Sequence, residues 1–70
     1  MDIITAAGRA LWGERWQSEM ARATGRSIRT VQRWAAGTSA PHRSVYDDLI
    51  AIAADRIAGL GELVKRLQSH

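Results

Sequence analysis

The sequence contains no cysteine, which excludes the disulfide framework that holds many small secreted domains together. Histidine is scarce too. His42 and His70 are the only two, and they lack the spacing of a metal site, so we expect no metal ion and no cofactor. No apolar run approaches the ~18–20 residues that cross a bilayer. The N-terminus also lacks the basic start and apolar stretch of a signal peptide, so we expect a cytoplasmic protein without a membrane partner.

The usual signatures of enzymes are missing as well. The sequence has no cysteine nucleophile, no serine–histidine–acid set and no glycine-rich phosphate loop. A chain of 70 residues also has difficulty forming a cleft of the usual ligand size. We therefore expect neither catalysis nor a small-molecule ligand.

The length and composition favour one small helical domain. Seventy residues leave room for a single domain with a thin core. Alanine and arginine, both good helix formers, are frequent, and proline occurs once. These features predict an all-α fold of four to five helices. Because neither a disulfide nor a metal is available to stabilise a thin core, self-association is the remaining common aid.

Basic residues gather in the middle of the chain. Residues 15–43 hold six arginines and one acid, Glu19, a net charge of 6 − 1 = +5, whereas the rest carries 4 − 6 = −2. Guanidinium groups suit phosphate and guanine edges better than ammonium groups do. An arginine-rich stretch is also found on ordinary solvated helix surfaces, and composition alone leaves both interpretations open.

Apolar spacing and capping residues predict three short helices before this basic stretch ends. The linker between the second and third is only Gly25, Arg26 and Ser27, with Ser27 as the expected N-cap. Two helices joined this tightly, with a glycine in the turn, form a helix-turn-helix unit, here at about residues 16–36. The three helices are expected at about residues 3–12, 16–24 and 27–36.

A long helix is predicted after the loop of residues 37–43. Ser44 followed by Asp47 resembles a capping box at its start. Gly59 and Gly61 predict a kink or break. We therefore divide the single domain into a helical body, residues 1–43, and a C-terminal helix, residues 44–70.

Apolar residues of this helix recur with spacings of 4, 3, 4, 3, 4 and 3, the pattern of a coiled-coil heptad. We call this stripe the heptad seam. Its first half, from Tyr46 to Ala53, is expected to pack on the body. The second half, Ile57, Leu60, Val64 and Leu67, has little body left to cover and is expected to form a homodimer interface. The heptad seam comprises Tyr46, Ile50, Ala53, Ile57, Leu60, Val64 and Leu67.

The third helix has a distinct inner and outer side. Val31 and Trp34 lie three residues apart and are expected to pack onto Met20 and Ala21 of the second helix. The two other tryptophans are expected to pack against the C-terminal helix. With these aromatic residues in the core, the arginines of the third helix face outward.

The segment from Gln17 to Trp34 resembles the helix-turn-helix of phage Cro/repressor-type (XRE-like) regulators, and the similarity is strongest over residues 14–43. Thr24 and Arg26 depart from the pattern, since the family usually has apolar residues there. The resemblance implies a lambda-repressor-like fold, with the third helix in the major groove of DNA and Gln17 at a phosphate. The matching residues are Ala21, Gly25, Ser27, Arg29, Thr30, Val31, Arg33, Trp34 and Gly37.

The residue types also indicate individual roles. Arg33 can read guanine and Gln32 adenine through bidentate contacts. Arg29 and Thr30 can reach a base or a phosphate. Ser27 and the helix N-terminus offer donors to a phosphate. Arg26 and Arg43 are expected to clamp the DNA backbone.

The sequence is compatible with two functions. In the first, the chain is a dimeric transcriptional regulator, most simply a repressor or autorepressor of phage or mobile-element type, that binds an inverted repeat in double-stranded DNA. In the second, the helix-turn-helix is only a scaffold, and the chain is an interaction or inhibitor module for another protein.

Overall fold

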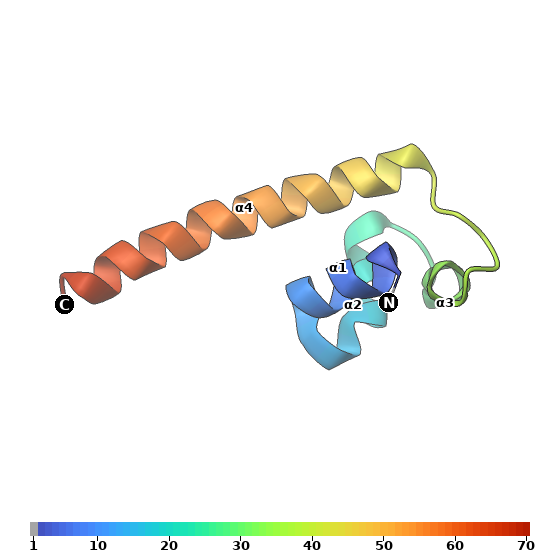
Figure 1. Cartoon of the computed structure of the whole chain (residues 1–70), viewed down its shortest axis with the longest axis horizontal. Coiled ribbons are helices and arrows are strands. Elements are labelled where there is room, and N and C mark those ends of the chain that lie inside the picture. The colour runs from blue at the N-terminus through green and yellow to red at the C-terminus, as the bar shows by residue number, and fades with distance from the viewer. Residues whose placement is uncertain (1) are drawn as a thin grey trace.

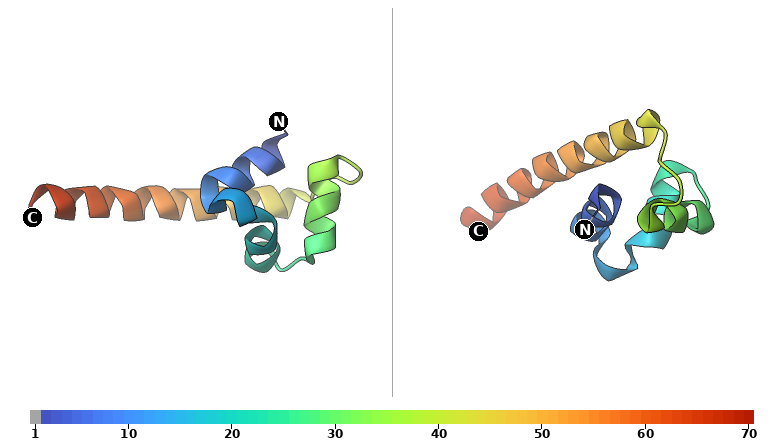
Figure 2. Two further views of the ribbon diagram at one scale, coloured as in Figure 1. Left: turned by 90° about the horizontal axis from the view of Figure 1, so that it is seen from below. Right: turned by 45° about the vertical axis from the view of Figure 1, so that its right-hand side comes forward.

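The computed structural model describes residues 2–70, and all regular structure in that range is helical. The all-α class is therefore confirmed. Helices α1, α2 and α3 gather beside the first half of α4, and the second half of α4 extends away from them (Figures 1 and 2). The molecule is accordingly elongated, 48 × 23 × 21 Å. In order, the elements are α1 (Ile3–Trp12), a 3₁₀ helix η1 (Gly13–Arg15), α2 (Trp16–Thr24), α3 (Ile28–Ala36) and α4 (Arg43–Gln68).

Helix α1 begins and ends at residues that satisfy its free backbone groups. One carboxylate oxygen of Asp2 accepts a hydrogen bond from the Thr5 backbone N–H, and the other accepts one from the Thr5 hydroxyl, both at 2.9 Å. The helix ends at Gly13, whose φ of 78° suits glycine. Near this end, the Arg56 guanidinium of α4 donates to the Leu11 carbonyl. A cation at a helix C-terminus is favourable, so Arg56 ties α4 to α1.

The turn between α2 and α3 has the short form expected from the sequence. Gly25 adopts the left-handed conformation, φ 69° and ψ 27°, and its N–H donates to the Ala21 carbonyl. Ser27 then caps α3, since its hydroxyl oxygen accepts from the Thr30 backbone N–H at 3.1 Å. These two ends fix the direction in which α3 leaves α2.

The core lies where α1, α2, α3 and the start of α4 meet. Thr24 is its one buried polar residue among those described, and its hydroxyl donates to the Met20 carbonyl at 2.8 Å. The polar side chain is thus satisfied at a position where the resembled family has an apolar one. Trp12 is only partly buried, whereas Trp16 is in the core. The core residues are Ile4, Trp16, Met20, Ala21, Val31, Trp34, Val45 and Leu49.

The start of α4 differs from the prediction. The helix begins at Arg43, and its N-cap is His42, whose Nδ1 accepts a hydrogen bond from the Ser44 N–H at 3.1 Å. The predicted capping box at Ser44 is therefore wrong. Asp47 lies more than one turn into the helix, where its carboxylate instead faces the Arg43 guanidinium at 3.3 Å. Because the backbone of His42 is extended, its imidazole nitrogen takes the capping role that the sequence predicted for the Ser44 hydroxyl.

The predicted kink in α4 is also wrong. The helix runs unbroken through Gly59 and Gly61, both of which lie in open space and have negative φ angles. A glycine costs a helix interior only about 1 kcal/mol. The strong helix formers around the two glycines maintain the hydrogen-bonded ladder.

The first half of the heptad seam packs on the body only in part, since Tyr46 packs against the core and Ala53 is half-buried, whereas Ile50 is 59% exposed. The fully buried residues of this part of α4 are Val45 and Leu49. One residue corresponds to a rotation of about 100° around a helix, so the stripe that faces the body lies beside the heptad seam. The seam is consequently open to solvent over most of α4.

Candidate nucleic-acid interface

Helix α3 presents its polar residues on the side away from the core. Val31 is 0% and Trp34 6% exposed, so these two side chains fix the rotation of the helix. Arg29, Gln32 and Arg33 are all exposed. Because the apolar anchors are three residues apart and the polar residues fall between and beside them, α3 has one buried and one polar face, as the spacing predicted.

The start of α3 is organised by two hydroxyls that contact each other. The Ser27 and Thr30 hydroxyl oxygens lie 3.0 Å apart, and Ser27 also caps the Thr30 N–H. Thr30 is half-buried. Both residues therefore hold the end of the helix in place, and the first N–H groups of α3, which have no partner within the helix, remain to meet an anion.

The start of α2 lies next to the start of α3. Gln17, in the first turn of α2, shares a shallow hollow with Ile28 of α3, which is 47% exposed. Glu14 and Arg15 border the same hollow. The structure therefore places Gln17 beside Ile28 at the start of α3.

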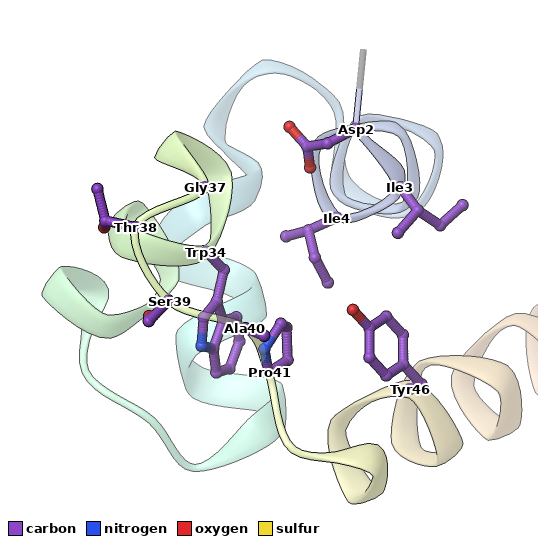
Figure 3. A pocket seen from close by; sticks show the side chains of 10 residues that line it. All are labelled: Asp2, Ile3, Ile4, Trp34, Gly37, Thr38, Ser39, Ala40, Pro41 and Tyr46. Carbon is purple, nitrogen blue, oxygen red and sulfur yellow. The ribbon is translucent and has the colours of Figure 1, made fainter.

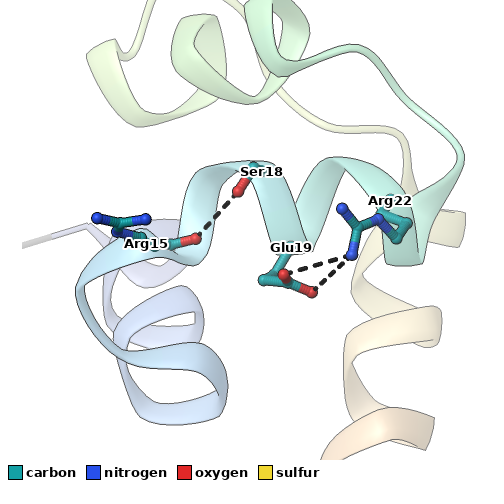
Figure 4. A network of polar contacts seen from close by, with 4 residues as sticks. All are labelled: Arg15, Ser18, Glu19 and Arg22. Atoms are coloured by element: carbon teal, nitrogen blue, oxygen red, sulfur yellow. Dashed lines mark hydrogen bonds and ion pairs between the residues drawn. The ribbon is translucent and has the colours of Figure 1, made fainter.

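Helix α2 also carries a network of polar contacts (Figure 4). The Ser18 hydroxyl donates to the Arg15 carbonyl at 3.3 Å, and the Arg22 guanidinium lies 3.4 Å from the Glu19 carboxylate. The Arg15 side chain points away from the Glu19–Arg22 pair (Figure 4). Arg22 is thus partly neutralised on its own helix.

The two arginines expected to clamp a backbone lie in different settings. Arg26, in the turn, is exposed, and its guanidinium donates to the Thr24 carbonyl at 3.0 Å. Arg43 opens α4 and pairs with Asp47, although its side chain is 73% exposed. By contrast, neither Arg29 nor Arg33 forms an ion pair within residues 2–70. Helix α3 contains no acidic residue, so these two arginines give it a net charge of +2.

A second hollow lies on the other side of the body, between the start of α1, the loop after α3 and the start of α4 (Figure 3). Ile4 and Tyr46 point into it from α1 and α4 (Figure 3). Its one carboxylate, Asp2, is engaged in capping α1. This carboxylate is therefore already committed to hydrogen bonds within α1.

Two further findings concern metal binding and membrane insertion. In the part of the chain that the structure describes, no group of three or more histidine, aspartate or glutamate residues is placed to hold a metal ion. None of the helices there combines the length and apolar character needed to traverse a bilayer.

Comparison of the chain with protein-family models, with curated proteins and with solved structures finds no match. The candidate interface is therefore defined by this chain's own residues: the exposed polar face of α3, the first turn of α2, and the turn between them.

Two residues that matter to this arrangement were missed from the sequence. Gly8 of α1 is buried against α2, and Arg56 links α4 to α1. The position of Gly8, four residues after Ile4 on the same face, could have indicated a close helix crossing. No local signal indicates the partner of Arg56, because Leu11 lies 45 residues away in sequence.

Proposed function

We propose that the chain binds double-stranded DNA in a sequence-specific manner through α3, as a small helix-turn-helix regulator of lambda-repressor-like type. One observation carries the proposal. Val31 and Trp34 anchor α3 in the core, and the exposed side of the helix presents Arg29, Gln32 and Arg33. The major groove of B-form DNA is wide enough to admit an α-helix, and side chains of these types read base edges there.

Arg33 and Gln32 are the proposed base-reading residues. Both are exposed near the middle of α3, and both have two donors or a donor and an acceptor in one plane. Arg33 would pair with guanine and Gln32 with adenine. Arg29, in the first turn, lies at the edge of the same face and would contact a base or a phosphate.

A second set of residues would hold the DNA backbone and set the register. Gln17 starts α2 beside the start of α3, and the N-terminus of α3, capped by Ser27, offers N–H groups to a phosphate. Arg26 and Arg43 are exposed on the flanks and would add non-specific affinity.

The simplest regulatory mechanism is repression by occupancy. The body and α4 together account for the described residues, 2–70. A dimer with twofold symmetry would present two copies of α3, so the binding site would be an inverted repeat. An autorepressor of this kind would act wherever its own promoter lies, in the cytoplasm of a bacterial cell.

The alternative function, a protein-interaction module, is favoured by a different observation. Large aliphatic residues of α4, such as Ile57 and Leu67, are 72% and 64% exposed. Exposed apolar patches of this kind mark protein interfaces. In this alternative α3 would carry its arginines merely as a solvated face.

Selection from a random duplex library, followed by fluorescence anisotropy over a range of salt concentrations, tests the proposal. Specific binding predicts an enriched inverted repeat and an affinity that falls steeply with salt, with a slope of about −0.9 per phosphate contacted. Weak binding that is equal for all duplexes and insensitive to salt would contradict DNA reading and favour the protein-interaction module.

A further inference from the structure

The second half of α4 carries an apolar surface without any covering from its own chain. It extends beyond the three-helix body (Figures 1 and 2). Residues 54–70 are exposed throughout, although aliphatic side chains recur there. The large aliphatic residues of this half are Ile57, Leu60, Leu63, Val64 and Leu67, which are 47–72% exposed.

A second apolar surface lies between α1 and the first half of α4. Ile3 of α1 is 66% exposed and Ile50 of α4 59% exposed, and they face the same groove. The other apolar residues that line it are Ile4, Ala7, Tyr46, Leu49 and Ala53. The groove therefore has one wall from α1 and one from the heptad seam.

The two surfaces are continuous along α4. From Ile50 to Leu67 the heptad seam spans about 26 Å at 1.5 Å per residue. A sustained 4–3 spacing of apolar residues is the pattern by which one helix packs along another helix. The occupant that this stripe suits is therefore a helix with the same repeat, and α4 of a second copy is such a helix.

We propose that two copies pair through α4 in antiparallel orientation, so that the second half of each α4 lies in the partner's groove between α1 and α4. This inference deepens the dimeric regulator proposed above. Three observations support it: where the apolar stripe widens, how charge is distributed along α4, and how the heptad residues match.

The widening of the stripe distinguishes the two orientations. Leu49, Arg56 and Leu63 follow one another at intervals of seven, so they share one flank of the heptad seam. Leu49 is buried by the body, and Arg56 bonds to α1, whereas Leu63 is 47% exposed. In an antiparallel pair each flank meets the same flank of the partner helix. Leu63 would then meet the partner's α1.

A parallel pair would place Leu63 differently. Each flank would then meet the opposite flank of the partner, which carries small and polar residues. Leu63 would then stay partly exposed to solvent, and no side chain of the partner would fill the groove beside Ile3. The opposite flank comprises Asp47, Ala54, Gly61 and Gln68.

Charge along α4 also favours the antiparallel orientation. Residues 43–56 carry two basic and three acidic residues, a net charge of 2 − 3 = −1. Residues 57–70 carry two basic residues and one acidic residue, 2 − 1 = +1. Antiparallel pairing sets each acidic half against a basic half, whereas parallel pairing sets like charges together.

The heptad residues match in one antiparallel register that covers the exposed seam. Its centre lies between Ile57 and Leu60, so that Ile57 of each copy opposes Leu60 of the other. Ala53 then opposes Val64, which pairs a small side chain with a branched one. Ile50 opposes Leu67 at each end.

Cysteine crosslinking tests this orientation, and the chain has no cysteine of its own to interfere. Ile50→Cys and Leu67→Cys are purified separately, mixed, and equilibrated in a glutathione redox buffer. Antiparallel pairing predicts that the mixed disulfide between the two variants dominates on a non-reducing gel. Self-linked pairs of each variant in place of mixed ones would overturn the inference, as would a monomeric mass in light scattering with no crosslink.

A second pair tests the groove itself. Ile3→Cys mixed with Leu67→Cys should also crosslink, because Leu67 opposes Ile50 in this register and Ile3 lines the same groove as Ile50. Ala51→Cys mixed with Leu67→Cys is the matched control, since Ala51 is exposed and lies about 100° around α4 from Ile50. Crosslinking of the control to the same extent would count against the groove. All substituted positions are exposed or partly exposed in the single chain, and far-UV circular dichroism verifies that each variant folds.

Both crosslinking experiments are carried out in the absence of DNA, so their outcome does not depend on the proposed DNA binding. Crosslinking as expected with no sequence-specific DNA binding would leave the dimer standing and reject the proposed function. Sequence-specific binding without mixed crosslinks would do the reverse.

Discussion

Gly8 of α1 lies directly against the indole ring of Trp16 on α2, so that a Cβ atom at Gly8 would collide with the ring. Trp16 is 4% exposed and belongs to the core. The close approach of the two helices therefore depends on the absence of a side chain at one position. Since α2 supports α3, this contact also helps to position the proposed DNA-binding face.

Replacing Gly8 by alanine should destabilise the fold. Forcing one extra methyl group into a packed core costs about 1–3 kcal/mol. Urea unfolding followed by tryptophan fluorescence measures the loss. Gly59→Ala is the matched control, because Gly59 lies in a helix interior with open space around it and should gain up to about 1 kcal/mol. Equal stability of the two variants would contradict the packing argument.

Ser27→Ala should weaken the start of α3. The substitution removes the oxygen that accepts from the Thr30 N–H, and loss of such a cap costs about 0.5–2 kcal/mol. Thermal or urea unfolding gives the change in stability. Ser27→Asp restores an acceptor at the same position and should recover most of the loss. An unchanged free energy of unfolding for Ser27→Ala would show that the cap contributes nothing.

The cap of α1 should make stability depend on acid. Hydrogen bonds from the Thr5 backbone N–H, and then from its hydroxyl, favour the charged carboxylate and lower the pKa of Asp2 below its ordinary value. A lowered pKa in the folded state means that the stabilisation is complete above the unfolded pKa of about 4. It is lost as the pH falls through the folded pKa.

Urea unfolding of the parent chain and of Asp2→Ala over the acid range tests this cap. The variant should be less stable at neutral pH, and the two stabilities should converge as the pH falls. Thr5→Val keeps the backbone donor and removes the hydroxyl, so it should show a smaller effect of the same sign. A constant difference between Asp2→Ala and the parent at all pH values would contradict the linkage.

Arg33→Ala and Arg43→Ala should affect DNA binding in different ways. Loss of a bidentate contact to guanine costs about 1–3 kcal/mol and relaxes preference at one base pair. Loss of a phosphate contact weakens binding to all sequences alike and lowers the salt slope by about one. Anisotropy titrations on the selected duplex and on a scrambled one separate the two effects. Arg66→Ala, near the end of α4, is the control expected to bind normally.

Leu60→Glu combined with Val64→Glu should dissociate the dimer without unfolding the chain. Both side chains are at least half exposed in the single chain, so the core does not depend on them. Paired across an interface, four buried carboxylates would each carry a desolvation cost. Light scattering measures the mass, and circular dichroism the helix content. A variant that stays dimeric would contradict the role of the heptad seam.

The local structure was largely predictable because it depends on neighbouring residues. Asp2, Ser27 and the turn glycines determine where α1, α2 and α3 begin and end, and Val31 with Trp34 determines which side of α3 is buried. The exposure of Arg29 and Arg33 follows from that spacing. These features use interactions that span at most one or two helical turns.

The predictions for α4 failed where the outcome depends on distant parts of the chain. The N-cap is His42 rather than Ser44 because the loop after α3 leads into a helix that already begins at Arg43. Periodicity identified an apolar stripe correctly but not the side that meets the body. That choice follows from the fit of Val45 and Leu49 against the core, which lies outside any local pattern.

By itself the sequence determined that the chain is helical, where its three short helices lie, and that the basic residues of α3 face outward, because short-range hydrogen bonding and the 3.6-residue period act within each segment. Only the tertiary structure decided how closely α1 and α2 approach, how α4 is tied to Leu11 through Arg56, and that the heptad seam is left open. Those outcomes depend on volumes and partners brought together from residues far apart in the chain.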